Sequence, residues 1–484
     1  MRNFLLPLAC LASTAFGATQ PPNVLLICVD DLKPTLGCYG DKTAKTPNLD
    51  LLASKGLQFD RAYCNQAVCA PSRNNLLVGS RSSTLGIYDL GTNFRKAVPD
   101  AVTLPQLFRQ NGYKAEAVGK LFHTGHGNTD DAASWSVPTQ LEPVVEYLDP
   151  ESTAGGQLTR EEAFFTNREL GRIGKLPRGS AWEIVDAPDN AYADGRIAEE
   201  GIRRLIAAKE SGKPFFLALG FVKPHLPFTA PKKYWDLYKP SDFKLAEYRK
   251  EPEGAPKYAA KWGGEVNNYD PLPENGRFDD KLSVQMMHGY YAAVSYVDAQ
   301  IGKVLAELYR LGLADNTIIV LWGDHGYHLG DHGYWTKHTN YEEANHIPLI
   351  MVAPGVTTPG THTGQLAETV DIYPTLASLA GFPPLDVPQQ IDGEDLTPVL
   401  RDPSARVRDH AFHCFPLGGR LGRAIRTDRY RLVEWKKPGA PRESADLELY
   451  DYETDPLEKR NLAQSNPQVV EELLKILYRH PEAK

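Results

Sequence analysis

Five short apolar runs, separated by stretches with helical periodicity, most constrain the fold of this chain. The apolar runs span residues 24–29, 115–118, 215–219, 318–322 and 349–352. Helical periodicity lies between them, at residues 103–110, 192–209 and 285–311. Buried strands that alternate with helices are typical of a mostly parallel sheet flanked by helices. The sequence therefore predicts an α/β fold, and its 484 residues are enough to bury a sizeable core.

Polar side chains follow four of these predicted strands at the point where each strand ends. They are, in chain order, Asp30 and Asp31, Lys120 and His123, Lys223 and His225, and Asp324 and His325. Ligands of open α/β sheets bind outside the carboxyl ends of the strands. The sequence therefore predicts that acids, bases and cations from four strands meet at one edge of the sheet, in an active site.

The chain after about residue 405 has a different pattern. Residues 423–434 alternate like an exposed strand, 447–451 read as a second strand, and 466–479 as a closing amphipathic helix. We predict a catalytic domain over residues 19–405 and a smaller C-terminal α+β subdomain over 406–484. Two further segments, 160–186 and the Pro- and Gly-rich 250–277, are expected to shape the pocket, the second as a surface insertion near its mouth.

The N-terminus predicts an exported protein. Residues 1–18 combine a basic start, a short apolar stretch and small residues at the end, which is typical of a secretory signal peptide. We expect a periplasmic or secreted location, or a lysosome-like compartment in a eukaryote, and no later segment is apolar enough to span a membrane. The formal charge of −8 argues against a nucleic acid partner.

The cysteine count also bears on function. Cys10 lies in the signal peptide, which leaves five cysteines, an odd number for an exported protein. One of them therefore has a role other than disulfide pairing. The sequence leaves open whether the four cysteines other than Cys69 are free or paired, and it favours a buried free thiol for Cys28, which lies in an apolar strand.

The acids at the strand ends predict a divalent cation site. Asp30, Asp31 and Asp324 supply hard oxygen ligands, which suit calcium or magnesium. His325 departs from an all-oxygen set, and imidazole prefers transition metals, so another divalent ion stays open. The competing interpretation is that each Asp caps the next turn or helix.

Residues 69–73 read Cys-Ala-Pro-Ser-Arg and precede an apolar, helix-compatible run. Pro71 suits a first helical turn. A nucleophile at Cys69 would meet the unsatisfied N–H groups and the positive end of the helix dipole, which stabilise an oxyanion. The competing interpretation is a buried thiol in a Pro-containing turn.

Cations and histidines complete the candidate site. Arg73, Lys120 and Lys337 are charge-assisted donors that could hold an anion. His123 and His225 could transfer protons near neutral pH. The competing interpretations are solvated lysines and structural histidines, although both histidines follow predicted strands.

These residues resemble the type I, formylglycine-dependent sulfatases of the alkaline phosphatase-like superfamily, most closely the iduronate-2-sulfatase branch. His325, where many sulfatases have Asn, resembles that branch in particular. The resemblance covers nearly the whole mature chain, and it implies an alkaline phosphatase-like sheet. The matching stretches are residues 23–31, 46–50, 69–73, 119–123, 220–228, 322–326, 337–340, 347–350, 371–375, 425–427 and 449–451.

The resemblance implies a nucleophile and a metal. Cys69 would be oxidised to formylglycine by a sulfatase-maturing enzyme, and its hydrate would attack sulfur. Calcium, or magnesium or another divalent ion, would be bound by Asp30, Asp31, Asp324, His325 and the modified Cys69.

It also implies roles for the other side chains. Arg73 and Lys120 would hold the nucleophile, and Lys337 and His225 would bind the sulfate. His225 would protonate the leaving alcohol, and His123 would later accept a proton so that sulfate departs.

The leading hypothesis is an exported sulfatase acting on sulfated polysaccharide or glycosaminoglycan, with 2-O-sulfated uronic acid as the substrate unit. One alternative is a phosphodiesterase or phosphonate monoester hydrolase of the same superfamily, because a similar pocket fits phosphoryl groups. The other is a non-catalytic binder of sulfated glycans in which Cys69 stays a thiol. Fold does not fix substrate.

Overall fold

The structure is a computed structural model that describes residues 21–168 and 170–482. The predicted signal peptide, residues 1–18, lies outside the described residues. Over the part of the chain that is described, none of the helices combines the length and apolar character needed to cross a bilayer.

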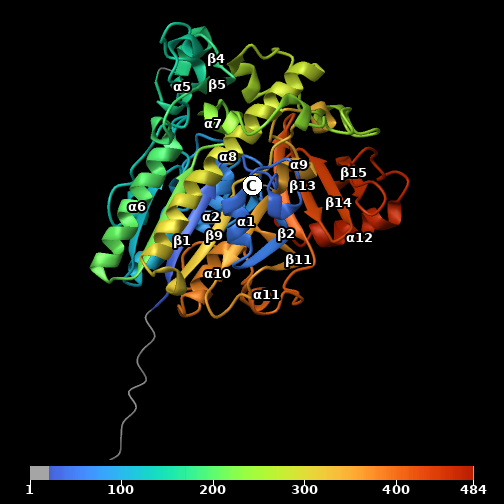
Figure 1. The fold of residues 1–484 in the computed structure, drawn as a ribbon. Helices are drawn as coiled ribbons and strands as arrows, with labels where there is room; N and C mark the ends of the chain where they lie inside the picture. The colour runs from blue at the N-terminus through green and yellow to red at the C-terminus, as the bar shows by residue number, and fades with distance from the viewer. Residues whose placement is uncertain (1–20, 169, 483–484) are drawn as a thin grey trace, which may run out of the picture.

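A seven-stranded sheet forms the centre of the molecule (Figure 1). All five apolar runs are strands of this sheet, as predicted, and β2 and β11 are two strands that the sequence analysis missed. The prediction of a mostly parallel sheet is confirmed at β3, β6, β1 and β9. In sheet order the strands are β11 (Thr361–Glu368), β2 (Leu57–Tyr63), β10 (His346–Val352), β9 (Thr317–Gly323), β1 (Asn23–Val29), β6 (Phe215–Phe221) and β3 (Lys114–Gly119).

The expectation of a parallel strand at residues 349–352 is wrong. These residues belong to β10, which runs antiparallel to both β9 and β2. An apolar run indicates that a strand is buried on both faces. The direction of the strand in the sheet depends on the connection before it. Here the chain leaves β9 at the carboxyl edge and enters β10 from that same edge, so the two strands run in opposite directions.

Helices cover both faces of the sheet, as predicted. Side chains of β1 alternate between two hydrophobic clusters, with Leu25 and Ile27 in one and Val24 and Leu26 in the other. The first face is covered by α1 (Pro47–Ala53), α6 (Ala193–Ser211) and α8 (Asp280–Arg310), and the second by α2 (Cys69–Val78), α4 (Leu104–Gln110) and α10 (Ile372–Leu379). The shorter helices are α3 (Ser82–Leu85), α9 (Glu342–Asn345) and α11 (Thr397–Arg401).

A four-stranded antiparallel sheet and a helix follow at the C-terminus, which confirms a smaller α+β unit. The helix, α12 (Pro467–Leu477), packs on the sheet through Leu473 and Leu477. The boundary near residue 405 stays a prediction. The strands are β12 (Ala411–Leu417), β13 (Arg420–Arg426), β14 (Tyr430–Lys436) and β15 (Asp446–Asp451).

The expectation of one exposed strand over 423–434 is wrong. The segment is a hairpin of β13 and β14, and both strands are largely buried. Its charged side chains suggested exposure, but they form buried ion pairs. Arg423 pairs with Glu434, and Arg431 pairs with Glu342 of α9.

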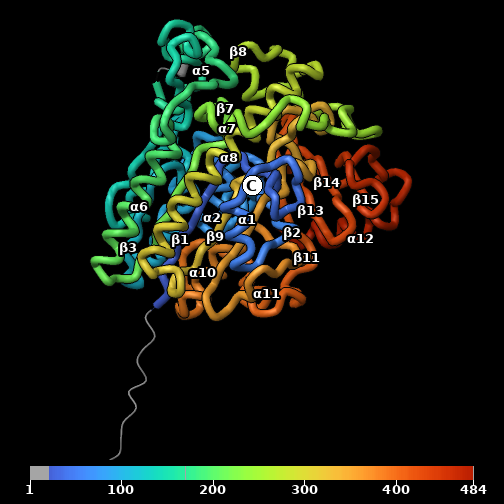
Figure 2. Tube along the Cα trace, viewed as in Figure 1, coloured from blue at the N-terminus to red at the C-terminus, as the bar shows by residue number. Residues whose placement is uncertain are grey.

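Two segments far apart in sequence lie together beyond the carboxyl ends of the parallel strands of the sheet (Figures 1 and 2). One is formed by residues 160–168 and 170–185, and the other by residues 228–270. They are joined where β4 pairs with β8 and where β5 pairs with β7. These elements form an upper layer from which short helices reach the site. They are α5 (Arg160–Phe165), β4 (Gly179–Ser180), β5 (Trp182–Val185), β7 (Phe228–Pro231), α7 (Lys232–Trp235) and β8 (Tyr269–Asp270).

Candidate active site

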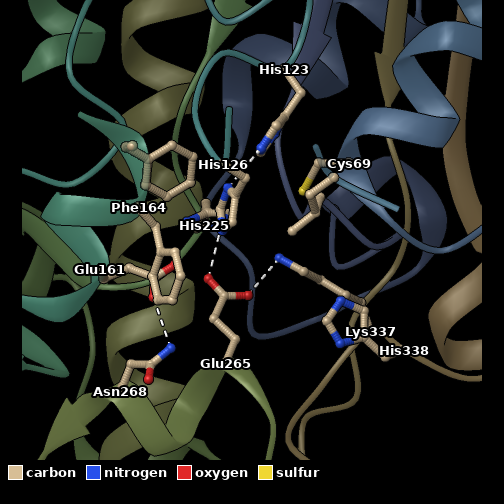
Figure 3. Close-up of a pocket in the computed structure, with 12 residues that line it drawn as sticks. Cys69, His123, His126, Glu161, Phe164, His225, Glu265, Asn268, Lys337 and His338 are labelled. Carbon is tan, nitrogen blue, oxygen red and sulfur yellow. Dashed lines mark hydrogen bonds and ion pairs between the residues drawn. The ribbon is translucent and has the colours of Figure 1, made fainter. Parts of the chain in front are cut away.

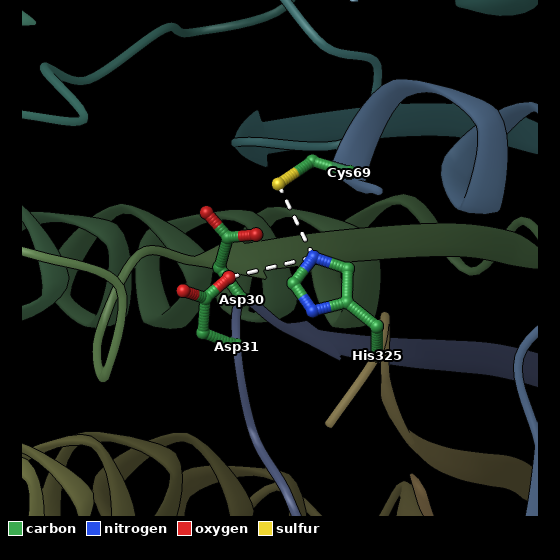
Figure 4. A group of neighbouring side chains, drawn as sticks. All are labelled: Asp30, Asp31, Cys69 and His325. Carbon is green, nitrogen blue, oxygen red and sulfur yellow. Dashed lines mark hydrogen bonds and ion pairs between the residues drawn. The ribbon is translucent and has the colours of Figure 1, made fainter. Parts of the chain in front are cut away.

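Four of the predicted metal ligands lie close together (Figure 4). Asp30 and Asp31 follow β1, His325 follows β9, and Cys69 begins α2. Ligand atoms of Asp30, Asp31, Cys69 and His325 all lie within 4.8 Å of one another. The Nε2 of His325 is 3.3 Å from the Sγ of Cys69 and 3.4 Å from the Oδ1 of Asp31. Asp324, the fifth predicted ligand, borders this group with its Oδ1 3.5 Å from the same nitrogen.

The backbone holds these side chains in position. Asp31 has a φ of 57°, a left-handed conformation that few residues other than glycine adopt. Its N–H donates to the Oδ1 of Asp324 at 3.0 Å, which joins the ends of β1 and β9. The Nδ1–H of His325 donates to the carbonyl of Gly326 at 3.0 Å, so the lone pair of Nε2 points into the cluster.

The donor set fits a divalent cation. Asp30, Asp31, Asp324 and His325 are almost fully buried, and they offer carboxylate oxygens and one imidazole nitrogen. Burial and the neighbouring Asp30 carboxylate raise the pKa of Asp324 to about 8, because like charges lie close together in a poorly solvated place. A doubly charged cation would offset this repulsion.

Cys69 is the first residue of α2, as the sequence predicts for a helix-terminal nucleophile. The whole helix is buried, and Cys69 itself is only 3% exposed. Burial raises the pKa of the Cys69 thiol well above its ordinary value, which keeps the unmodified side chain protonated. The Oγ–H of Ser72 donates to the carbonyl of Asp324 and ties the helix to the metal-ligand candidates.

Arg73 and Lys120 form ion pairs with the acids of this site. The Nη2 of Arg73 is 3.2 Å from Asp30 Oδ1 and 3.0 Å from Asp324 Oδ2, and Lys120 pairs with Asp30. Burial acts to raise the pKa of Asp30, but the charges of Lys120 and Arg73 hold it well below its ordinary value. Both cations therefore contact carboxylates of the site, and they keep Asp30 negatively charged.

His225 and Lys337 are connected by a residue that the sequence analysis missed, Glu265 (Figure 3). The carboxylate of Glu265 lies 3.0 Å from the Nε2 of His225 and 2.8 Å from the Nζ of Lys337. Lys337 also pairs with Asp31 at 2.9 Å. Glu265 belongs to the 250–277 insertion, so that segment does reach the site.

A cavity of about 220 Å³ opens beside Cys69 (Figure 3). His123, His225 and Lys337 line it, and the Nε2 of His123 is 3.1 Å from the Nδ1 of His126. Lys223, which follows the same strand as His225, instead donates to the carbonyls of His225 and Pro227 and so supports this loop. Sequence reasoning missed several lining residues, including Leu90, His126, Glu161, Phe164, Asn268 and His338.

Comparison with family models decides the class of the protein. A model described as Sulfatase matches residues 22–382, and one described as N-sulphoglucosamine sulphohydrolase, C-terminal, matches residues 330–482. The chain belongs to the sulfatase family. It is therefore a sulfuric ester hydrolase of the alkaline phosphatase-like superfamily, as the resemblance predicted. Sulfatases typically use a divalent metal and formylglycine.

One curated relative agrees with this assignment, and two solved structures share the fold. The sulfatase is 38% identical to iduronate 2-sulfatase of Mus musculus over 426 residues, which cover 79% of this chain and 73% of the relative. Its fold is similar to that of a protein solved in complex with its substrate D-glucosamine-2-N,6-O-disulfate, with a TM-score of 0.74, 22% identity and coverage of 95% and 97%. It is also similar to the phosphonate monoester hydrolase of Agrobacterium radiobacter, with a TM-score of 0.71, 23% identity and coverage of 95% and 96%.

Proposed function

We propose that this sulfatase removes sulfate from 2-O-sulfated uronic acid units of a sulfated polysaccharide or glycosaminoglycan, with position 69 as the nucleophile. The observation that carries the proposal is the placement of Cys69 at the N-terminus of α2, between the metal-ligand cluster and the cavity. The choice of substrate is supported by the 38% identity to an iduronate 2-sulfatase.

Two groups would supply chemistry that the twenty standard side chains lack. Calcium, or magnesium or another divalent ion, bound by Asp30, Asp31, Asp324, His325 and position 69, would act as a Lewis acid on the sulfate. Formylglycine formed from Cys69 would provide an aldehyde hydrate as the nucleophile.

The remaining side chains would bind the ester and move protons. Lys337 would attract the sulfate oxygens, since its Nζ lies at the cavity wall. His225 would donate a proton to the leaving alcohol, and His123 would accept a proton when sulfate departs. Arg73 and Lys120 would hold the nucleophile, and their ion pairs with Asp30 would keep that carboxylate ionised and in place.

We also propose that the protein is exported, to the periplasm or outside the cell, or to a lysosome-like compartment in a eukaryote. The support is the composition of residues 1–18. A sulfatase-maturing enzyme would be its partner before secretion.

Phosphate chemistry is the second candidate, because the fold is shared with a phosphonate monoester hydrolase. Sulfate and phosphate monoesters with the same leaving alcohol, together with a phosphonate ester, separate the two. Faster hydrolysis of the phosphorus esters would overturn the sulfatase substrate assignment. Tight binding of sulfated glycan without turnover, with the nucleophile converted, would favour the non-catalytic binder.

The first experiment is mass spectrometry of the tryptic peptide spanning residues 62–73, from protein expressed with a sulfatase-maturing enzyme. We expect a mass that matches formylglycine at position 69. A cysteine mass, with a control sulfatase converted in the same cells, would overturn the nucleophile assignment.

A further inference from the structure

The cavity has a polar end that lies across from Cys69 (Figure 3). Glu161 is only 4% exposed, and its Oε2 accepts a hydrogen bond of 2.8 Å from the Nδ2 of Asn268. Both residues line the same cavity as Cys69. The proposed sulfur chemistry uses neither of them.

Two short helices place this pair. In α5, Glu161, Phe164 and Phe165 are three and four residues apart, so they share one face of the helix, and all three line the cavity. The side chain of Thr159 and that of Glu162 form a capping box that fixes the start of this helix. The cavity-facing side of α5 is therefore held independently of Glu161.

Asn268 comes from the opposite segment, the 3₁₀ helix Glu265–Asn268. Residues three apart lie above one another in such a helix, so Glu265 and Asn268 face the same side. Glu265 contacts His225 and Lys337, and Asn268 contacts Glu161. The hydrogen bond between Glu161 and Asn268 therefore joins segments 160–186 and 250–277 at the wall of the cavity.

The pair can both donate and accept hydrogen bonds. Burial and the nearby Glu265 carboxylate raise the pKa of Glu161 to about 8, so the side chain is mostly uncharged at neutral pH. A neutral carboxyl group has one donor and retains acceptor capacity. Phe164, which stacks on His126 with ring centroids 4.9 Å apart, supplies an apolar wall beside it. Apolar walls with a few placed polar groups are typical of small-molecule pockets.

We propose that Glu161, held by Asn268, is a specificity-determining residue that hydrogen-bonds a hydroxyl group of the sugar ring bearing the sulfate. This inference rests on the proposed function as a saccharide sulfatase. The cavity of about 220 Å³ leaves room for one sugar ring, being smaller than the 300–1,000 Å³ or so of pockets for drug-sized ligands. A substrate without the hydroxyl leaves buried polar groups unpaired and is rejected.

The test compares two substrates with protein whose conversion at position 69 has been verified. They are the sulfated saccharide that the wild-type enzyme hydrolyses fastest, from a panel led by a 2-O-sulfated uronic acid disaccharide, and 4-nitrophenyl sulfate, which has no ring hydroxyl. We expect Glu161→Ala to lower the ratio of the two kcat/KM values roughly 10- to 100-fold. Glu161→Gln keeps a donor and an acceptor and should restore the ratio to within about fivefold of wild type.

Glu162→Gln is the matched control, because it changes a carboxylate of the same helix, keeps an oxygen that can accept the capping-box hydrogen bond, and lies at a position that does not line the cavity beside Cys69. An unchanged ratio in Glu161→Ala, an equal loss on both substrates, or the same shift in Glu162→Gln would overturn the inference. Hydrolysis of the aryl sulfate but of no saccharide by the wild type would also overturn it. Absence of any sulfate ester hydrolysis by converted wild type would instead overturn the proposed function.

Discussion

The carboxylate of Glu265 lies 3.0 Å from the Nε2 of His225. That contact uses Oε1 of Glu265, and Oε2 lies 2.8 Å from the Nζ of Lys337. One acid of the 250–277 insertion therefore connects His225, the proposed proton donor, with Lys337, the proposed sulfate-binding cation. Burial lowers the pKa of His225 to about 3 even with the charge of Glu265 acting in the opposite direction. Glu265 therefore favours the protonated imidazole that an acid needs.

Glu265→Gln should lower kcat/KM for a sulfate ester roughly 10- to 100-fold, because His225 loses the anion that favours its protonated form. The loss should be larger for an ester of a poor leaving alcohol than for an aryl sulfate, whose leaving group needs less protonation. Glu274→Gln, at an exposed position of the same insertion, is the matched control and should behave as wild type. Equal losses on both esters would argue against a role in proton transfer.

Cys69→Ser should turn over once and stop. The serine hydroxyl can attack sulfur while the leaving alcohol departs, but the resulting serine sulfate has no second hydroxyl on the same carbon whose loss of a proton would expel sulfate. Intact-protein mass spectrometry should detect an added sulfate group after incubation with substrate. Cys69→Ala is the control, and it should acquire no sulfate and show kcat reduced roughly a thousandfold or more.

Chelation should inactivate the enzyme and lower its melting temperature. Asp30, Asp31 and Asp324 are buried close together, so removing a divalent cation restores their mutual repulsion. We expect at least about a tenfold loss of kcat in EGTA or EDTA, reversed by calcium or magnesium. Asp31→Asn should show low activity that chelators change little. Full activity after exhaustive chelation, with no metal detected by elemental analysis, would contradict the metal site.

Acid should loosen the contact between α9 and the C-terminal sheet. Burial acts to raise the pKa of Glu342, but Arg426 and Arg431 of that sheet hold it well below its ordinary value. Its folded pKa is thus lower than its unfolded pKa, so its stabilisation is complete above about pH 4.5 and is lost as the pH falls through the folded pKa.

The measurement is the free energy of unfolding from denaturant titrations between pH 7 and pH 3. Glu342→Gln should cost about 3 kcal/mol at pH 7, because Arg431 is left partly unpaired in a buried position. The cost should shrink below pH 4.5. A cost that does not vary with pH would show that Glu342 contributes through packing rather than charge.

Much of the fold was predictable because burial on both faces leaves a plain pattern. Val24 to Val29 is a continuous apolar run, and it forms the central strand β1. The strand β2 was missed because Asp60 and Arg61 interrupt its apolar pattern, and β11 because Thr361 to Gln365 is mainly polar. These strands lie at and next to one edge of the sheet, where fewer apolar side chains are needed.

The site likewise contains some residues that the sequence predicts and others that it does not. Asp30, Asp31 and His325 follow apolar strands directly, so sequence order alone predicts that they meet. Glu265 and Glu161 lie in segments that the sequence analysis assigned to no strand or helix, and the pairing of β4 with β8 joins these two segments. No local pattern encodes that pairing. The sequence analysis placed both acids in segments expected to shape the pocket, 160–186 and 250–277, but it gave no signal for the individual residues.

The burial of Cys69 bears on when the proposed oxidation of this residue can take place relative to folding. The side chain is 3% exposed and begins a helix in which every residue is buried. The residues on either side of it, 62–68 and 70–80, are buried as well. The proposed oxidation of Cys69 by a maturing enzyme would therefore precede folding, and a molecule that folds first would keep its thiol until it unfolds.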